Sequence, residues 1–359
     1  MRCWLTPAVM ARMSNLSYSC VLRSPTFCGA ILLAALTPYA PAQERNHGRP
    51  PGCGLYDNIQ VTAADLPTPS DRQTLASCKS EDLYFGFDSP ADPVQARKCA
   101  YIERENRADA NDRVFGAAGL LTMIYANGKG ASRNFELALK FACEVEGAEA
   151  ENNGRFDHLL KLKREHWTGD DFSLCDDATS GFMDGWCAQI QERFDQIRRQ
   201  RNLDRILEKW SLADRPAFAE LQRSASKFFE VSSRNEVDLS GTSRGAFEIG
   251  AAASLNDNFL AALVSLEGGQ FPKFTTAEFG LADAKLNVVY AAIQSAQHDP
   301  NMAGTVTPEG IKLAQRAWLS YREAWVRFGS RRYPSVTGAS WRTWLTRERI
   351  EMLQPNDAK

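Results

Sequence analysis

Apolar residues recur most regularly between residues 275 and 354, in three successive stripes with the spacing of α-helices. The first stripe follows Thr275 and Glu278, which form a capping box, and it runs through Ala282, Leu286, Val289 and Ile293. The second stripe follows Pro308, a residue favoured in the first turn of a helix, and runs through Ile311, Ala314, Trp318, Tyr321, Trp325 and Phe328. The third follows the break at Gly338 and contains Trp341, Leu345 and Leu353. The pattern predicts three helices that pack into one small bundle.

Helical spacing also begins near residue 81 and continues to residue 187. One predicted helix stops at the break 127–130, which holds two glycines, and Asn134 can cap the next helix, so the sequence predicts a helix hairpin. This hairpin resembles the Sel-one-like repeats, relatives of the tetratricopeptide repeat, at Leu121, Tyr125, Gly128, Gly130, Asn134, Ala138 and Phe141. A degenerate copy is suggested just before it by Tyr84, Gly86, Asp92 and Ala96.

The remaining parts of the chain are less regular. Residues 43–80 are rich in proline, glycine and turn residues, and they predict an extended arm. Residues 188–270 predict polar helices from Ala188 to Trp210 and from Arg215 to Arg234, then another helix around residues 259–266. The whole chain is therefore expected to be all-α. Its expected segments are a signal peptide (1–42), the arm (43–80), a disulfide-linked helical region (81–187), a helical middle region (188–270) and a three-helix domain (271–359).

The middle region contains a short echo of the three-helix domain. Leu221-Gln222-Arg223 followed by Phe228 has the spacing of Ala314-Gln315-Arg316 followed by Tyr321. The sequence leaves open whether residues 188–270 are a second, worn copy of the same unit.

The first 42 residues have the features of a secretory signal peptide. Three arginines precede the apolar run 27–36, which is too short to span a bilayer, and no acidic residue occurs before Glu44. Ala40-Pro41-Ala42 has the form of a signal-peptidase site, so we expect cleavage before Gln43. An uncleaved anchor is the alternative. The expected mature protein is periplasmic or secreted and has no transmembrane anchor.

Six of the 9 cysteines lie beyond the expected cleavage site, namely Cys53, Cys78, Cys99, Cys143, Cys175 and Cys187. An even number in an oxidising compartment indicates disulfide bonds, although sequence does not choose among the possible pairings. No pair has CxxC spacing, which argues against a zinc site. We expect Cys53 and Cys78 to tie the arm to the helices that follow it. A bond between Cys175 and Cys187 requires a turn at Gly181, because one continuous helix would hold the two residues about 18 Å apart.

The C-terminal helices also carry three spaced motifs: Leu286-Asn287-x-x-Tyr290, Gln315-x-x-Trp318-x-x-Tyr321-Arg322-Glu323 and Leu345-Thr346-x-x-Arg349-x-x-x-Leu353. Together they resemble the N-terminal domain family of LprI-like lysozyme inhibitors. Members of that family commonly carry two cysteines where this chain has Val326 and Trp341, so apolar packing would replace their disulfide. The resemblance implies a non-catalytic binding protein of the cell envelope, with lysozyme as its partner.

Arg349 lies four residues after Leu345 and four before Leu353, which places it on the buried side of its helix. A buried guanidinium needs a carboxylate partner, and we expect Glu323 or Asp283 to supply it. We interpret this pair as one that specifies the fold rather than as a direct ligand contact. Helical spacing likewise favours core packing over ligand binding for Trp318, Tyr321 and Trp325.

No arrangement of side chains in the sequence predicts catalysis. The four histidines beyond the signal peptide lie in no zinc-protease or triad motif, and there is no nucleophile elbow or phosphate loop. The acidic residues Asp170, Asp171, Asp176, Asp177 and Asp184 lack the spacing of a calcium-binding loop, and we interpret them as a solvated loop. We expect no enzymatic activity, no cofactor, no metal and no nucleic-acid partner.

Charge is distributed unevenly along the expected mature chain. Residues 271–359 hold 12 Lys plus Arg against 8 Asp plus Glu, whereas residues 43–270 hold 27 against 36. Because lysozymes are usually cationic, electrostatics favours the acidic part, and not the C-terminal unit, as a docking surface for them. Two hypotheses follow from the sequence. One is an envelope binding protein that inhibits lysozyme-type muramidases, and the other is an interaction scaffold built on helical repeats.

Overall fold

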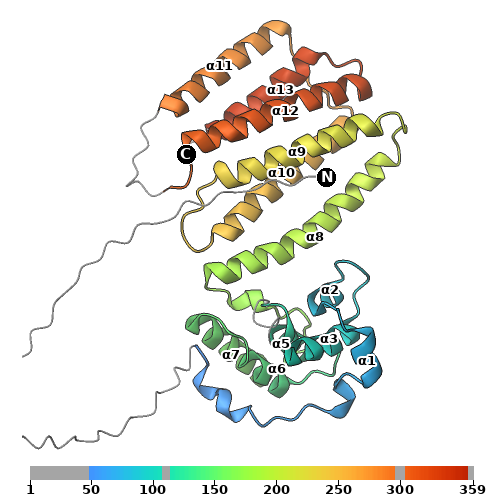
Figure 1. The fold of residues 1–359 in the computed structure, drawn as a ribbon, viewed down its shortest axis with the longest axis vertical. Helices are drawn as coiled ribbons and strands as arrows, with labels where there is room; N and C mark the ends of the chain where they lie inside the picture. Colours follow the sequence, from blue (N-terminus) through green and yellow to red (C-terminus); the bar gives the residue numbers. More distant parts are fainter. Residues whose placement is uncertain (1–47, 107–113, 296–303, 355–359) are drawn as a thin grey trace, which may run out of the picture. The chain divides into compact units, whose positions relative to one another are not determined.

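The computed structural model describes residues 48–106, 114–295 and 304–354 (Figure 1). These residues form twelve α-helices and three short 3-10 helices, and no strand occurs within the described ranges. The prediction of an all-α fold is confirmed. The expected signal peptide lies outside the described residues.

The first half of the described chain consists of the arm and the helices that follow it. Its helices are α1 (Pro69–Thr74), α2 (Ser80–Phe85), α3 (Pro93–Glu105), α5 (Ala117–Asn127), α6 (Phe135–Ala142) and α7 (Glu149–Arg164). The prediction that the arm is extended is wrong in part, because it contains 3-10 helices at Pro51–Leu55 and Ala63–Asp65 and helix α1, which Thr68 caps. The predicted hairpin is confirmed as α5 and α6. Helix α5 ends at Gly128, whose φ of 69° is left-handed, and α6 begins after Asn134, whose side chain accepts hydrogen bonds from two backbone amides.

Three disulfides cross-link this half of the chain, so the prediction that the six cysteines pair is confirmed. Cys53 bonds to Cys143 after α6, and Cys78 bonds to Cys99 in α3, so both tie the arm to the following helices as expected. Cys175 bonds to Cys187, with Cα atoms 5.9 Å apart. That bond forms because the chain turns ahead of Gly181, where the next helix begins.

Six longer helices follow: α8 (Gly181–Leu207), α9 (Arg215–Asn235), α10 (Arg244–Glu267), α11 (Thr276–Ser295), α12 (Pro308–Arg332) and α13 (Gly338–Leu353). Helix α8 begins earlier than the predicted Ala188, because the Ser180 hydroxyl caps its first turn. It therefore runs across residue 187, where we expected a boundary between segments. Its first half packs into the N-terminal core through Ile190, and its second half packs into the C-terminal core through Leu203. The segment boundaries stay a prediction.

The six longer helices form two sets of three, and in each set the first helix packs on the third (Figure 1). Helix α8 packs on α10, α11 packs on α13, and the middle helices α9 and α12 pack on each other. The middle helices are antiparallel, because Arg327 of α12 pairs with Glu220 of α9 and the start of α12 lies against Asn235 at the end of α9. The two residues of the sequence echo, Phe228 and Tyr321, stack on each other there with ring centroids 5.4 Å apart.

Helices α11, α12 and α13 form as predicted, and Trp318, Trp325 and Trp341 are buried. Their apolar faces do not close a core of their own, however. Phe259 of α10 packs on Trp325 with centroids 5.5 Å apart, and one hydrophobic cluster extends from α8 to α13. Trp341 is buried in that cluster and the partly buried Val326 packs against it, so apolar packing occupies the two positions for which the resemblance implied cysteines.

Helix α10 is long and apolar enough to cross a membrane on length and composition alone. In the structure it contacts α8 and α9, and its Leu263 and Leu266 are buried in the C-terminal core. The absence of a transmembrane anchor from the mature chain stays a prediction.

Candidate functional site

The eight motif residues of the C-terminal unit lie on α11, α12 and α13. Tyr290, Arg322 and Glu323 are half-buried and Asn287 is exposed. The other four motif residues are buried, which indicates that they contribute to packing: Gln315, Trp318, Tyr321 and Arg349. Burial also raises the pKa of the Tyr321 hydroxyl above its usual range.

Arg349 is 0% exposed and makes three hydrogen bonds through its guanidinium group. Its Nη1 donates to Glu236 at 2.8 Å, its Nη2 donates to the second oxygen of the same carboxylate, and its Nε donates to the Oε1 of Gln315 at 2.9 Å. The prediction that Arg349 is buried and paired with a carboxylate is confirmed. The prediction that Glu323 or Asp283 is the partner is wrong, because the partner is Glu236 at the end of α9.

The register of α12 against α13 explains this error. The two helices are antiparallel, so Arg342 near the start of α13 meets Glu323 at 2.8 Å, and Arg349 two turns later meets Gln315 near the start of α12. Glu323 lies eight residues beyond Gln315, which is about 12 Å along the helix axis and out of reach of Arg349. Asp283 pairs instead with Arg322, at 3.5 Å.

A cleft of about 870 Å³ lies beside the Arg349 network. Residues of α9, α10, α12, α13 and the segment between α10 and α11 line it. This volume falls within the range of ligand-binding clefts in proteins. Aromatic rings dominate its walls: Phe228, Phe229, Phe259, Phe271, Phe274, Trp318, Tyr321 and Trp344. The sequence did not predict this cleft, because the rings come from separate helices that only the tertiary fold brings together.

Two carboxylates, Glu348 and Glu351, also line the cleft from α13. Neither forms an ion pair with any residue that the structure describes. Desolvation by the neighbouring atoms is the main cause that raises the pKa of the Glu348 carboxyl to about 7, although the residue is exposed at the surface. A hydrogen bond with Trp344 acts in the opposite direction, and the nearby Glu351 raises this pKa further. The cleft therefore combines aromatic walls with negative charge.

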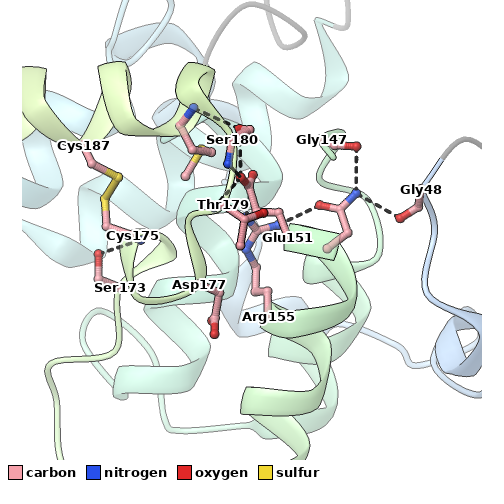
Figure 2. Close-up of polar contacts among 12 residues, drawn as sticks. Gly48, Gly147, Glu151, Arg155, Ser173, Cys175, Asp177, Thr179, Ser180 and Cys187 are labelled. Atoms are coloured by element: carbon pink, nitrogen blue, oxygen red, sulfur yellow. Dashed lines mark hydrogen bonds and ion pairs between the residues drawn. A yellow bond between two sulfur atoms is a disulfide. The ribbon is translucent and has the colours of Figure 1, made fainter. Parts of the chain in front are cut away.

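A second buried polar cluster lies between α7 and the start of α8 (Figure 2). Glu151 accepts hydrogen bonds from the amide and the hydroxyl of Ser180, at 3.1 and 2.9 Å. Arg155 donates to Asn152 at 3.0 Å, and the amide group of Asn152 donates to the carbonyl of Gly48 in the arm. Because the cluster joins the arm, α7 and the disulfide loop, we interpret it as structural.

The acidic residues around this loop are engaged in local contacts. Asp170 pairs with Lys129 at 2.9 Å, Asp176 caps the short helix after Ser173, and Asp177 lies 3.0 Å from a nitrogen of His158. Within residues 48–106, 114–295 and 304–354, no group of three or more His, Cys, Asp or Glu side chains is placed to hold a metal ion.

These features define a class: a disulfide-bonded helical protein with an acidic, aromatic cleft in its C-terminal part. Residues 272–353 match the family model described as Lysozyme inhibitor LprI, and this range holds α11, α12 and α13. The match agrees with the resemblance of the three motifs. The comparison gives no support for the resemblance to Sel-one-like repeats. No curated protein and no solved structure matches the chain.

Proposed function

We propose that the protein is a non-catalytic binding protein of the periplasm or cell surface that inhibits lysozyme-type muramidases. The observation that carries the proposal is the match of residues 272–353 to a family described as a lysozyme inhibitor. The matched residues form α11, α12 and α13, in which Arg342 of α13 pairs with Glu323 of α12. Arg349 of α13 pairs with Glu236 at the end of α9, outside the matched range.

The expected location supports the same proposal. Three disulfides are typical of proteins that fold outside the reducing cytoplasm. An inhibitor of muramidases must act in that space, because muramidases cut the cell wall there. The signal peptide predicted for residues 1–42 provides the route of export.

An inhibition assay tests the proposal directly. Purified, oxidised protein comprising residues 43–359 is added to a chicken-type lysozyme that is clearing a suspension of bacterial cell walls. We expect the clearing rate to fall with increasing protein and to reach a plateau, as for saturable binding. Unchanged clearing at a large molar excess, together with no heat of binding in calorimetry, would contradict the proposal.

A second candidate function is a scaffold that holds other envelope proteins. One observation favours it: the outer face of α11 exposes Leu281 at 75% and Val288 at 70%, in addition to the apolar face that α11 buries. Cross-linking the tagged chain in envelope fractions distinguishes the two functions. A scaffold retains partners that Leu281→Asp and Val288→Asp release, whereas these substitutions leave a pure lysozyme inhibitor fully active.

A further inference from the structure

The charge of the cleft differs from that of the unit around it. Residues 271–359 carry more Lys and Arg than Asp and Glu. The charged residues that line the cleft are nevertheless Glu348, Glu351 and Arg349. Arg349 is fully engaged by Glu236 and Gln315, so its charge is already neutralised by a carboxylate outside the cleft lining. Glu348 and Glu351 are therefore the charged residues of the cleft lining that have no ion-pair partner among the described residues, although the unit around them is basic.

The aromatic walls suit a cationic group as well as an apolar one. Trp344 and Phe274 both line the cleft and are half-buried, and one of the two rings, that of Phe274, already has a cation of the chain over it. Arg347, which does not line the cleft, already lies over the Phe274 ring with its guanidinium carbon 4.4 Å from the centroid, and it also pairs with Glu278 at 3.6 Å. A guanidinium thus fits against this ring, as expected for the negative face of an aromatic ring.

We propose that the cleft receives an arginine or lysine side chain of a basic protein partner. The aromatic rings pack against the apolar stem of that side chain, and Glu348 and Glu351 pair with its charge. The identification of the partner as a lysozyme rests on the proposed function. The family match lies in the basic C-terminal unit, whereas a cationic lysozyme is expected to dock on an acidic surface. A cleft lined by two glutamates within that unit provides such a surface.

The first experiment measures lysozyme binding by calorimetry with a charge-matched pair of double variants. E348Q/E351Q removes both cleft carboxylates and keeps the shape of the side chains. E208Q/E309Q removes two exposed carboxylates that lie outside the cleft. Both variants are measured above pH 8, where the Glu348 carboxyl with its pKa of about 7 is ionised, so that the two variants change the net charge equally. We expect the cleft variant to weaken binding about tenfold or more, and the control to weaken it less than threefold. Equal effects of the two variants would show that only the overall charge matters, and they would overturn the proposal.

The second experiment does not depend on lysozyme. A blocked hexa-arginine peptide is titrated into the full mature chain while tryptophan fluorescence is followed, since Trp344 lines the cleft. We expect saturable quenching that W344F reduces and that E348Q/E351Q weakens, with melting temperatures confirming that both variants fold. Peptide binding through these residues without lysozyme binding would retain the cleft inference and refute the muramidase function. Lysozyme inhibition that is unaffected by E348Q/E351Q, in a chain that does not bind the peptide, would refute the cleft inference alone.

Discussion

Replacing Arg349 by methionine tests whether the buried ion pair specifies the fold or serves binding. Arg349 is 0% exposed and the side chain of Glu236 is 11% exposed, so almost no water is available to either group in place of its partner. Arg349→Met leaves the Glu236 carboxylate without a cation and the Oε1 of Gln315 without a donor. Removing one partner of such a pair costs about 3–5 kcal/mol of unfolding free energy.

Urea unfolding followed by circular dichroism measures this loss. The partner is replaced in Glu236→Leu, and the double variant R349M/E236L completes a thermodynamic cycle. We expect the double variant to be more stable than R349M, because the stranded carboxylate is gone, with a coupling energy of about 1–3 kcal/mol. Arg347→Met is the matched control on the same helix. Its ion pair with Glu278 is half-exposed and should contribute at most about 1 kcal/mol.

The reasoning would be refuted by a particular combination of results. If R349M and E236L were each neutral in urea unfolding but abolished lysozyme binding, Arg349 would be a functional contact and not a structural one. If R349M lowered the unfolding free energy and adding E236L recovered none of that loss, the ion pair with Glu236 would not be the cause of the destabilisation.

Further predictions concern packing, disulfides, pH and processing. Gly329→Ala places a methyl group against the indole of Trp341 and should cost about 1–3 kcal/mol, whereas Gly280→Ala, on the open side of α11, should stabilise by up to about 1 kcal/mol in the same urea assay. Removing Cys53–Cys143, with a separation of 90 residues, should cost about 2 kcal/mol more than removing Cys175–Cys187, with a separation of 12, when the serine variants are unfolded in urea. Lysozyme binding should weaken as the pH falls through about 7, because the raised pKa of Glu348 lets its carboxyl gain a proton there, and E348Q should flatten this profile in calorimetry. Intact mass of the protein from an envelope fraction should give a chain that begins at Gln43.

The features predicted correctly are those that local spacing determines. The helix hairpin follows from Gly128 and Asn134, which stop one helix and start the next within a few residues. The burial of Arg349 follows from its position between Leu345 and Leu353 on one helix face. Each of these predictions depends only on neighbours within one or two turns, where helix geometry leaves little freedom.

The features that were missed depend on contacts between distant segments. Glu236 and Arg349 are 113 residues apart in sequence, and nothing local to either residue indicates the other. The register of α12 against α13 could have excluded Glu323, but it could not have indicated α9. The cleft was missed for the same reason, since Phe259, Phe274 and Trp344 become neighbours only when α10 and α13 pack around it. Helix α8 begins before the predicted Ala188 because Ser180, inside the loop that Cys175 and Cys187 close, caps its first turn.

The position of Glu236 also bears on the echo between the middle region and the C-terminal unit. The echoing helices α9 and α12 pack antiparallel, and Phe228 stacks on its counterpart Tyr321, as expected where a two-fold axis relates two copies of a unit. This arrangement supports the hypothesis that residues 188–270 are a worn copy of the C-terminal unit. If so, the residues that match the family use the other copy to neutralise Arg349 and to cover Trp325. In isolation, residues 272–353 would expose Trp325 and would leave the guanidinium of Arg349 without its carboxylate. We therefore expect the two regions to unfold together in a single transition.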